Sequence, residues 1–248
     1  MKKLILSLSI LVAGMAHAQD SFKYEPVANK AEYYVSTYND RKDMGDYLKW
    51  ADDFKEYLAK SDVYDSMRSV ILVPYFHQNL QAMDSVWLNI WPSATQQFTA
   101  AQHWLQNGSS VLSKLPVTNS QAIDTYQWAI SAPDEDGSNG MVRFADCKLK
   151  EGVSARQAFD AYKDFAAAAK TKGDNLGRKM IFPSSGSIAG DFDYTYSLYS
   201  STVSELGAGA DNYWENINGS KEDIALGEVI ESCFNYRTYA TMLIKNAK

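Results

Sequence analysis

The sequence predicts an α+β protein that contains two tandem β-α-β-β-α-β repeats. A strand-like run, an amphipathic helix pattern and an Asn-Gly-Ser turn occur twice in this order, at 84–110 and at 192–220. The elements before and after these two stretches also follow one order in both halves. Between the halves lies 133–140, PDEDGSNG, an acidic segment with the turn-forming composition that is typical of a linker.

The first predicted repeat covers residues 30–132. Its first strand is expected at 31–38, AEYYVSTY, because Tyr, Val and Thr favour β-structure. Apolar residues at helical spacing then predict a helix at about 43–60; they are Met44, Leu48, Ala51, Phe54 and Leu58. Strands at 69–76, 86–91 and 123–131 and a helix that ends at Asn107 complete the repeat.

The second predicted repeat covers residues 141–245. A helix that begins after Ser154 and a second one from about 203 to 217 are expected between strands at 141–148, 178–182, 192–199 and 233–244. Matching landmarks are 108 residues apart for Trp91 and Tyr199 and 109 apart for Pro74 and Pro183. Loop insertions produce such small drifts. The alternative is an ordinary α+β chain in which the two patterns coincide by chance.

Residues 1–18 have the pattern of a secretory signal peptide. Lys2 and Lys3 precede an apolar run, and Ala16-His17-Ala18 is a small-x-small cleavage site. The run is far shorter than the roughly twenty residues needed to span a bilayer. We therefore expect an exported protein, periplasmic or secreted, with no integral membrane segment after cleavage.

Composition and motifs exclude several classes of function. The chain has 24 basic and 30 acidic residues, and cleavage of the leader removes two more lysines, which argues against nucleic-acid binding. No HExxH, GxSxG, P-loop or GxGxxG motif is present. Two cysteines cannot form a four-cysteine zinc site, and only His77 and His103 follow the leader. The sequence predicts no metal site and no cofactor.

The order β-α-β-β-α-β defines the ferredoxin-like unit, whose helices cover one face of an antiparallel sheet. Two such units can pack sheet to sheet and close a barrel with the helices outside. Over about residues 30 to 245, this order resembles the dimeric α/β-barrel superfamily in its fused two-repeat form. The resemblance implies a fold shared by cofactor-independent monooxygenases, stress-response proteins and haem-binding chlorite dismutase-like enzymes, so it does not select one function.

The first and last strands of a ferredoxin-like unit are antiparallel neighbours. Cys147 lies near the end of the first strand of the second repeat, and Cys233 lies at the start of the last. An exported protein with these adjacent strand ends is expected to form a Cys147–Cys233 disulfide. Two buried, reduced thiols are the alternative.

A direct Cys147–Cys233 pairing also places two arginines side by side. Antiparallel partners have a constant sum of residue numbers, and Arg143 with Arg237 gives the same sum, 380, as the two cysteines. Both would then point into the barrel, with Val142 and Phe144 toward the helices. Adjacent guanidinium groups would suit a carboxylate or phosphate ligand. Ion pairs with acids of the other half, or a solvated barrel rim, are the alternatives.

Alternation in the strand VWLNIW directs Trp87, Asn89 and Trp91 toward the barrel and Val86, Leu88 and Ile90 toward the helices. The corresponding residues of the second repeat are Thr195, Ser197 and Tyr199. Aromatic and polar groups in this arrangement suit a small-molecule pocket, although they equally fill a barrel core.

His77 follows the second strand and is a weak candidate for a catalytic base, with a solvated loop histidine as the alternative. A haem site would need His77 or His103 as its axial ligand, and neither lies in a known motif.

Three hypotheses follow from the sequence. The first is a barrel that binds a small anionic or aromatic ligand through Arg143, Arg237, Trp87, Trp91 and Tyr199. The second is a cofactor-independent monooxygenase-like enzyme that uses the same cavity. The third is a structural or interaction module with a filled barrel. The chain is expected to be a monomer or a homodimer.

Overall fold

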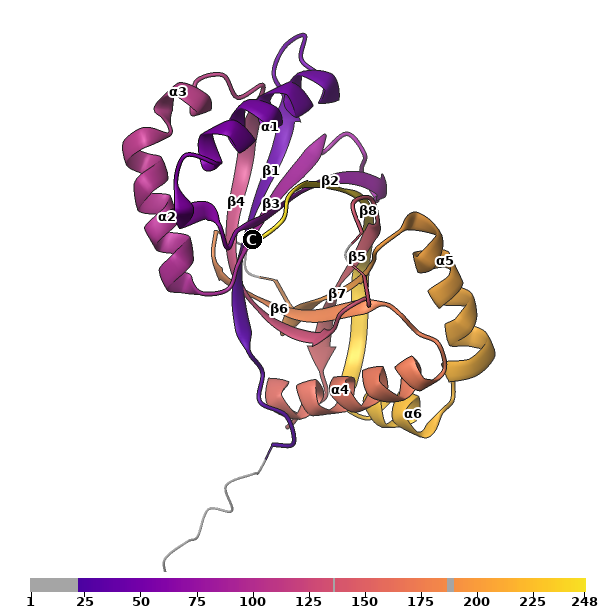
Figure 1. Ribbon diagram of the computed structural model, residues 1–248. Helices are drawn as coiled ribbons and strands as arrows, with labels where there is room; N and C mark the ends of the chain where they lie inside the picture. Colours follow the sequence, from indigo (N-terminus) through magenta and orange to yellow (C-terminus); the bar gives the residue numbers. More distant parts are fainter. Residues whose placement is uncertain (1–21, 136, 187–189) are drawn as a thin grey trace, which may run out of the picture.

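The computed structural model describes residues 22–135, 137–186 and 190–248, and the predicted signal peptide lies outside them. Eight antiparallel strands form a closed barrel in the order β1-β3-β2-β8-β5-β7-β6-β4, with the helices outside it (Figure 1). The predicted fold class is therefore confirmed. No helix in the described part of the chain is long and apolar enough to cross a bilayer.

The first half supplies β1 to β4 and three helices. Asp43 caps the first long helix by accepting a hydrogen bond from the Asp46 N–H, and Ser93 caps the second through the Gln96 N–H. The elements are β1 (Ala28–Tyr38), α1 (Met44–Leu58), a 3-10 turn (Asp62–Tyr64), β2 (Arg68–Phe76), β3 (Ser85–Trp91), α2 (Ala94–Asn107), α3 (Ser109–Leu112) and β4 (Val117–Ser131).

The second half repeats this order. Capping boxes start two of its helices, one formed by Ser154 with Gln157 and one by Thr202 with Glu205. The elements are β5 (Met141–Leu149), α4 (Ala155–Thr171), β6 (Gly177–Ser185), β7 (Tyr194–Ser200), α5 (Val203–Asn212), a π-helical turn (Tyr213–Ile217), α6 (Lys221–Gly227) and β8 (Ile230–Lys245).

Two long strands close the barrel. β4 pairs with β1 of its own half and with β6, and β8 pairs with β5 of its own half and with β2. These strands are 15 and 16 residues long, enough to pair on both edges. The halves are thus joined by backbone hydrogen bonds at both seams.

The faces of β3 are the reverse of those expected. Val86 and Leu88 belong to the apolar cluster inside the barrel, whereas Trp87 and Trp91 pack beneath the helices of the first half. The expected interior position of Trp87, Asn89 and Trp91 is therefore wrong. β3 matches β7 at a spacing of 109 residues, not 108, and a one-residue error inverts every side chain of a strand.

The predicted disulfide is present. Cys147 and Cys233 are direct partners on β5 and β8, and their Cα atoms are 4.1 Å apart. The register then slips by one residue, so that Phe144 pairs with Arg237 and Arg143 pairs with Thr238. The slip is a β-bulge, and Asn235 adopts a left-handed φ of 52° within it.

This bulge separates the two arginines. Arg237 faces the barrel interior as expected, but Arg143 lies on the outer face, beneath the helices of the second half. The expected interior position of Arg143 is therefore wrong. Val142 and Phe144, expected to face the helices, belong instead to the interior cluster.

Candidate functional site

A groove on the outer face of the second half, which we call the α5 groove, is the largest cavity among the described residues at about 960 Å³. β5 and β7 form its floor, α4 forms one wall, and α5 covers it. The main contacts come from Met141, Arg143, Tyr162, Tyr196, Leu198 and Leu206. In Figure 1, α5 runs along the right edge of the molecule, outside the barrel.

The same layer of the first half is packed with aromatic rings. Trp50 stacks on Phe54 with ring centroids 5.1 Å apart, and Trp87 meets Phe54 edge-on at 5.4 Å. A cavity of only about 170 Å³ remains there. The two halves share one architecture, so the larger space arises from the side chains and not from the topology.

Small residues on α5 leave this space open. The helix contains Gly207, Ala208, Gly209 and Ala210, and none of its residues is buried. A Cβ atom on Gly209 would lie 2.5 Å from Cδ1 of Leu176, which shows that the helix touches the body of the protein at this point. A Cβ atom on Gly207, which lines the groove, would meet nothing within 4 Å.

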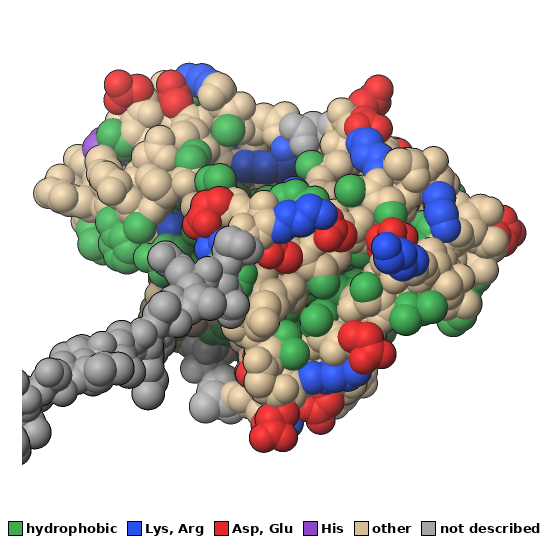
Figure 2. Space-filling view, turned by 90° about the horizontal axis from the view of Figure 1, so that it is seen from below, with side chains coloured by type: hydrophobic (Ala, Val, Ile, Leu, Met, Phe, Trp, Pro, Cys, Tyr) green, Lys and Arg blue, Asp and Glu red, His purple; other side chains and the backbone are tan. Residues whose placement is uncertain are grey.

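Exposed aromatic residues surround the opening of the groove. Trp214 is 71% exposed and lies in the π-helical turn, a backbone form that is rare and frequent at functional sites. Tyr75, Phe76 and Tyr236 also line the groove and are exposed. Elsewhere, on the face seen from below, acidic and basic side chains lie close together in mixed groups (Figure 2).

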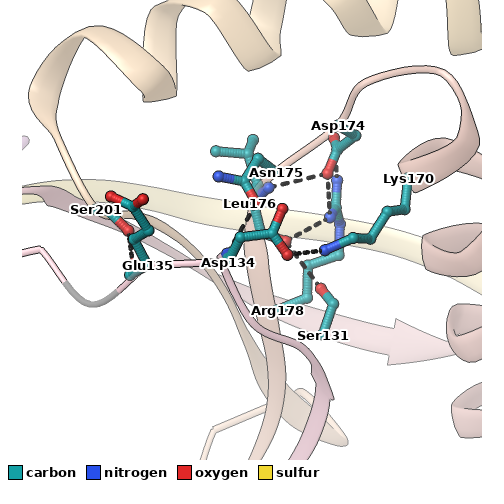
Figure 3. A network of polar contacts seen from close by, with 9 residues as sticks. All are labelled: Ser131, Asp134, Glu135, Lys170, Asp174, Asn175, Leu176, Arg178 and Ser201. Atoms are coloured by element: carbon teal, nitrogen blue, oxygen red, sulfur yellow. Dashed lines mark hydrogen bonds and ion pairs between the residues drawn. The ribbon is translucent and has the colours of Figure 1, made fainter.

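One arginine of the groove is fully neutralised. Arg178 is buried and donates to both carboxylate oxygens of Asp174 at 2.8 and 2.7 Å, and also to the Leu176 carbonyl at 2.9 Å. Figure 3 shows this pair beside Lys170, which contacts Asp134. A bidentate pair of this kind holds both groups in place, so we assign Arg178 a structural role.

The tyrosines beneath α5 are hydrogen-bond donors. Tyr162 stacks on Tyr196 with ring centroids 5.1 Å apart, and its hydroxyl lies 2.9 Å from that of Tyr194. Burial raises the pKa of Tyr162 and of Tyr196, although the nearby Arg178 and Arg143 oppose the rise at Tyr196. Both phenols are therefore protonated at neutral pH.

Arg143 is the cation of the groove that has no acidic partner. Among the described residues no carboxylate lies within 4 Å of it, and its guanidinium carbon sits 5.8 Å from the Tyr236 ring centroid. The groove's other carboxylate, Asp223, accepts hydrogen bonds from the Tyr213 hydroxyl and the Gly219 N–H. Arg143 is exposed, so its forked donors are open to an anion.

Arg237 has the opposite environment. It lines a cavity of about 520 Å³ at one end of the barrel and donates to both oxygens of Asp146 at 3.0 and 3.2 Å. Asp146 also accepts from Thr195 and Asn235, at 2.9 and 2.7 Å. The ion-pair alternative thus holds for Arg237, with an acid of its own half as the partner.

His77 lines the same 520 Å³ cavity. Its Nδ1 bonds within its own loop, 3.1 Å from the Asn79 nitrogen and 3.0 Å from the Asn79 carbonyl oxygen, and its ring meets Tyr239 edge-on at 5.9 Å. No described carboxylate forms an ion pair with it. The role of His77 as a base stays a prediction.

The predicted ligand-binding residues do not form one site. Arg237 lies at one end of the barrel, and Tyr199 lines a 240 Å³ cavity at the other. Trp87 and Trp91 line the small cavity of the first half, and only Arg143 lies in the α5 groove. Sequence reasoning missed Tyr196, Trp214 and the α5 glycines. The signal that could have found them is the Gly-Ala-Gly-Ala run in a helix expected to cover the core.

The groove does not fit the haem that the family resemblance implies. No histidine lines it, and its one cysteine, Cys233, is in the disulfide. His77 lies inside the barrel mouth, and His103 accompanies Tyr57 and Tyr64 in the first half. Within the described ranges no cluster of three or more His, Cys, Asp or Glu could hold a metal ion.

No protein-family profile matches the chain, and no curated protein matches its sequence. Solved structures do match. A chlorite dismutase variant from Candidatus Nitrospira defluvii superposes with a TM-score of 0.51 at 8% identity, over 91% of this chain and 95% of that one. A candidate monooxygenase from Lactobacillus acidophilus NCFM gives 0.50 at 10% identity, over 89% and 95%. At such identities the likeness concerns the fold alone: the chain has the dimeric α/β-barrel fold in its fused two-repeat form.

Proposed function

We propose that this protein binds a mostly apolar, anionic small molecule in the α5 groove. The observation that carries the proposal is the contrast between the halves: about 960 Å³ lies open where the first half leaves 170 Å³. A space of 960 Å³ is at the upper end of ordinary ligand pockets. A protein that needed only a stable core would gain from filling it, because empty apolar volume destabilises.

The lining sets the chemistry of the ligand. Leu198, Leu206 and Phe165 offer apolar contact, and the stacked rings of Tyr162 and Tyr196 offer a flat surface. Arg143 supplies the charge. A hydrogen bond to a charged group contributes about 1.5–3 kcal/mol, so the anionic group should strengthen binding at least tenfold.

Binding of matched probes tests this proposal. Naphthoate and naphthol share a ring system, and only naphthoate is anionic at pH 7; each can be titrated against bound anilinonaphthalene sulfonate. We expect naphthoate to bind more tightly, and Arg143→Gln to remove most of the difference. Arg41→Gln is the control, because Arg41 is 92% exposed in the first half and makes the same change in charge.

An unchanged preference for naphthoate in Arg143→Gln would refute the assignment of the anion site. Equal binding of naphthoate and naphthol by the wild-type protein would refute the anionic character of the ligand.

The other two hypotheses have less support. Catalysis at His77 lacks a carboxylate partner that would fix its tautomer. A filled barrel is not what the interior side chains form, since cavities of about 520 and 240 Å³ occupy its two ends. The Cys147–Cys233 bond supports export to an oxidising compartment, in line with the leader pattern.

A further inference from the structure

A lysine lies inside the barrel, away from the α5 groove. Lys179 is on β6 next to Arg178, and because strand residues alternate, Arg178 faces the groove while Lys179 faces the barrel interior. It lines the 240 Å³ cavity together with Gln127, Ser197 and Tyr199. This site is independent of the function proposed for the groove.

The surroundings of the Lys179 amine do not suit a charge. Its Nζ donates one hydrogen bond, to Oε1 of Gln127 at 2.8 Å, whereas an ammonium group has three donors. No carboxylate within the described ranges pairs with it, and the nearest printed ring, Tyr199, has its centroid 5.9 Å away. Burial, and next the charge of Arg68, lower the pKa of Lys179 to about 8.

The cavity is reachable from outside. It lies where the chain passes from β4 to β5, and Glu135, which lines it, is exposed. Other residues of this segment are tied to the second half: Asp134 contacts Lys170, and the Ser201 hydroxyl donates to the Glu135 carbonyl (Figure 3). The entrance is therefore a fixed part of the fold.

We propose that Lys179 is a nucleophilic amine that captures a small aldehyde within the barrel as an imine. The lone pair of the neutral Nζ attacks the carbonyl carbon, and the π electrons move to the oxygen. A proton passes from nitrogen to oxygen to give a carbinolamine, which loses water to form the C=N bond. Amine and aldehyde thus give imine and water, with no oxidant or reductant required.

Competitive reductive trapping tests the proposal. The full mature chain is treated with propanal and cyanoborohydride at pH 7.5, and each lysine's modification rate is measured by peptide mass spectrometry. A greater neutral fraction offsets the lower basicity of Lys179, so its peptide should be modified about tenfold faster than that of exposed Lys49.

A second buried amine provides an internal control. Burial lowers the pKa of Lys245 too, but its Nζ donates to the carbonyls of Asp65, Met67 and Asn246. Lys245 should therefore react no faster than Lys49. Lys179→Arg, which retains a cation but has no nucleophilic amine, should lose the fast site while circular dichroism stays unchanged.

The rate at Lys179 should rise with pH and level off near 8. The charged and titratable groups that line its cavity are Arg68, Glu135, Tyr33 and Tyr199, and burial raises the pKa of Tyr33. Modification of Lys179 at or below the rate of Lys49 would overturn the proposal. So would a fast site that persists in Lys179→Arg.

Discussion

Filling the α5 groove from Gly207 should leave the fold intact and abolish binding. In a helix interior, Gly destabilises by about 0.5–1 kcal/mol relative to Ala. A Cβ atom at position 207 meets nothing within 4 Å, so Gly207→Ala should raise the free energy of unfolding by nearly all of that amount. For a chain of this size, 1 kcal/mol corresponds to a shift of about 2–4 °C in Tm.

Gly209 gives the matched comparison within the same helix. The propensity gain of Gly209→Ala is equal, but its Cβ would lie 2.5 Å from Leu176 Cδ1 and 2.9 Å from Leu176 Cγ. Leu176 is buried and must move, which costs more than about 1 kcal/mol when a packed core is overfilled. Gly209→Ala should therefore have a lower Tm than Gly207→Ala, and no higher than that of the wild type.

Gly207→Trp then separates cavity from stability. The indole group would enter the groove, so anilinonaphthalene sulfonate should bind at least tenfold more weakly, with Tm at or above that of the wild type. Calorimetry and fluorescence titration measure the two quantities. Undiminished dye binding in a folded Gly207→Trp protein would refute the groove as the binding site. A loss of stability in Gly207→Ala would show that the space above the groove is not empty.

Three further predictions concern stability. Replacing both Cys147 and Cys233 with Ser opens a loop of 86 residues and should lower the free energy of unfolding by about 4 kcal/mol in urea titrations under non-reducing conditions; a loss below about 1 kcal/mol would contradict this. Asp146→Asn removes the charge that pairs with Arg237 and should cost about 3 kcal/mol, compared with almost nothing for exposed Asp52→Asn. For Lys179, the folded pKa of about 8 lies below the ordinary value of 10.5, so the unfolded state binds more protons between these pH values and stability should rise with pH in that window. Lys179→Met should thus be more stable than the wild type at pH 7, and the gap should narrow by pH 10; a constant gap would show that Lys179 is not desolvated.

The fold and the disulfide could be predicted because both depend on element order. Apolar periodicity locates strands and helices with little regard to side-chain detail, and the duplicated order defines the unit. Cys147 and Cys233 are neighbours in any ferredoxin-like unit, because its first and last strands pair. These inferences tolerate an error of one residue.

The facing of side chains does not tolerate such an error. The bulge at Asn235 moved Arg143 to the outer face, and a spacing of 109 residues rather than 108 reversed Trp87 and Trp91. An Asn is only a weak sign of a bulge, since it also occurs in ordinary turns. Strand pairing in three dimensions was needed to detect the slip.

The α5 groove could not be located from the sequence because it depends on side chains that are too small to fill it. The positions that match Trp91 and Ala100 at a spacing of 109 are Ser200 and Gly209. Each substitution is unremarkable alone. Only their alignment with the first half, once the register is correct, shows a layer of packing that has been removed.

Amide hydrogen exchange with and without saturating anilinonaphthalene sulfonate tests the central claim most directly. Bound ligand should slow exchange in 203–217, the helix and π-helical turn above the groove, and leave α2 of the first half unchanged. Protection confined to the barrel mouth around 77–83, with 203–217 unaffected, would contradict the account and move the binding site to the barrel.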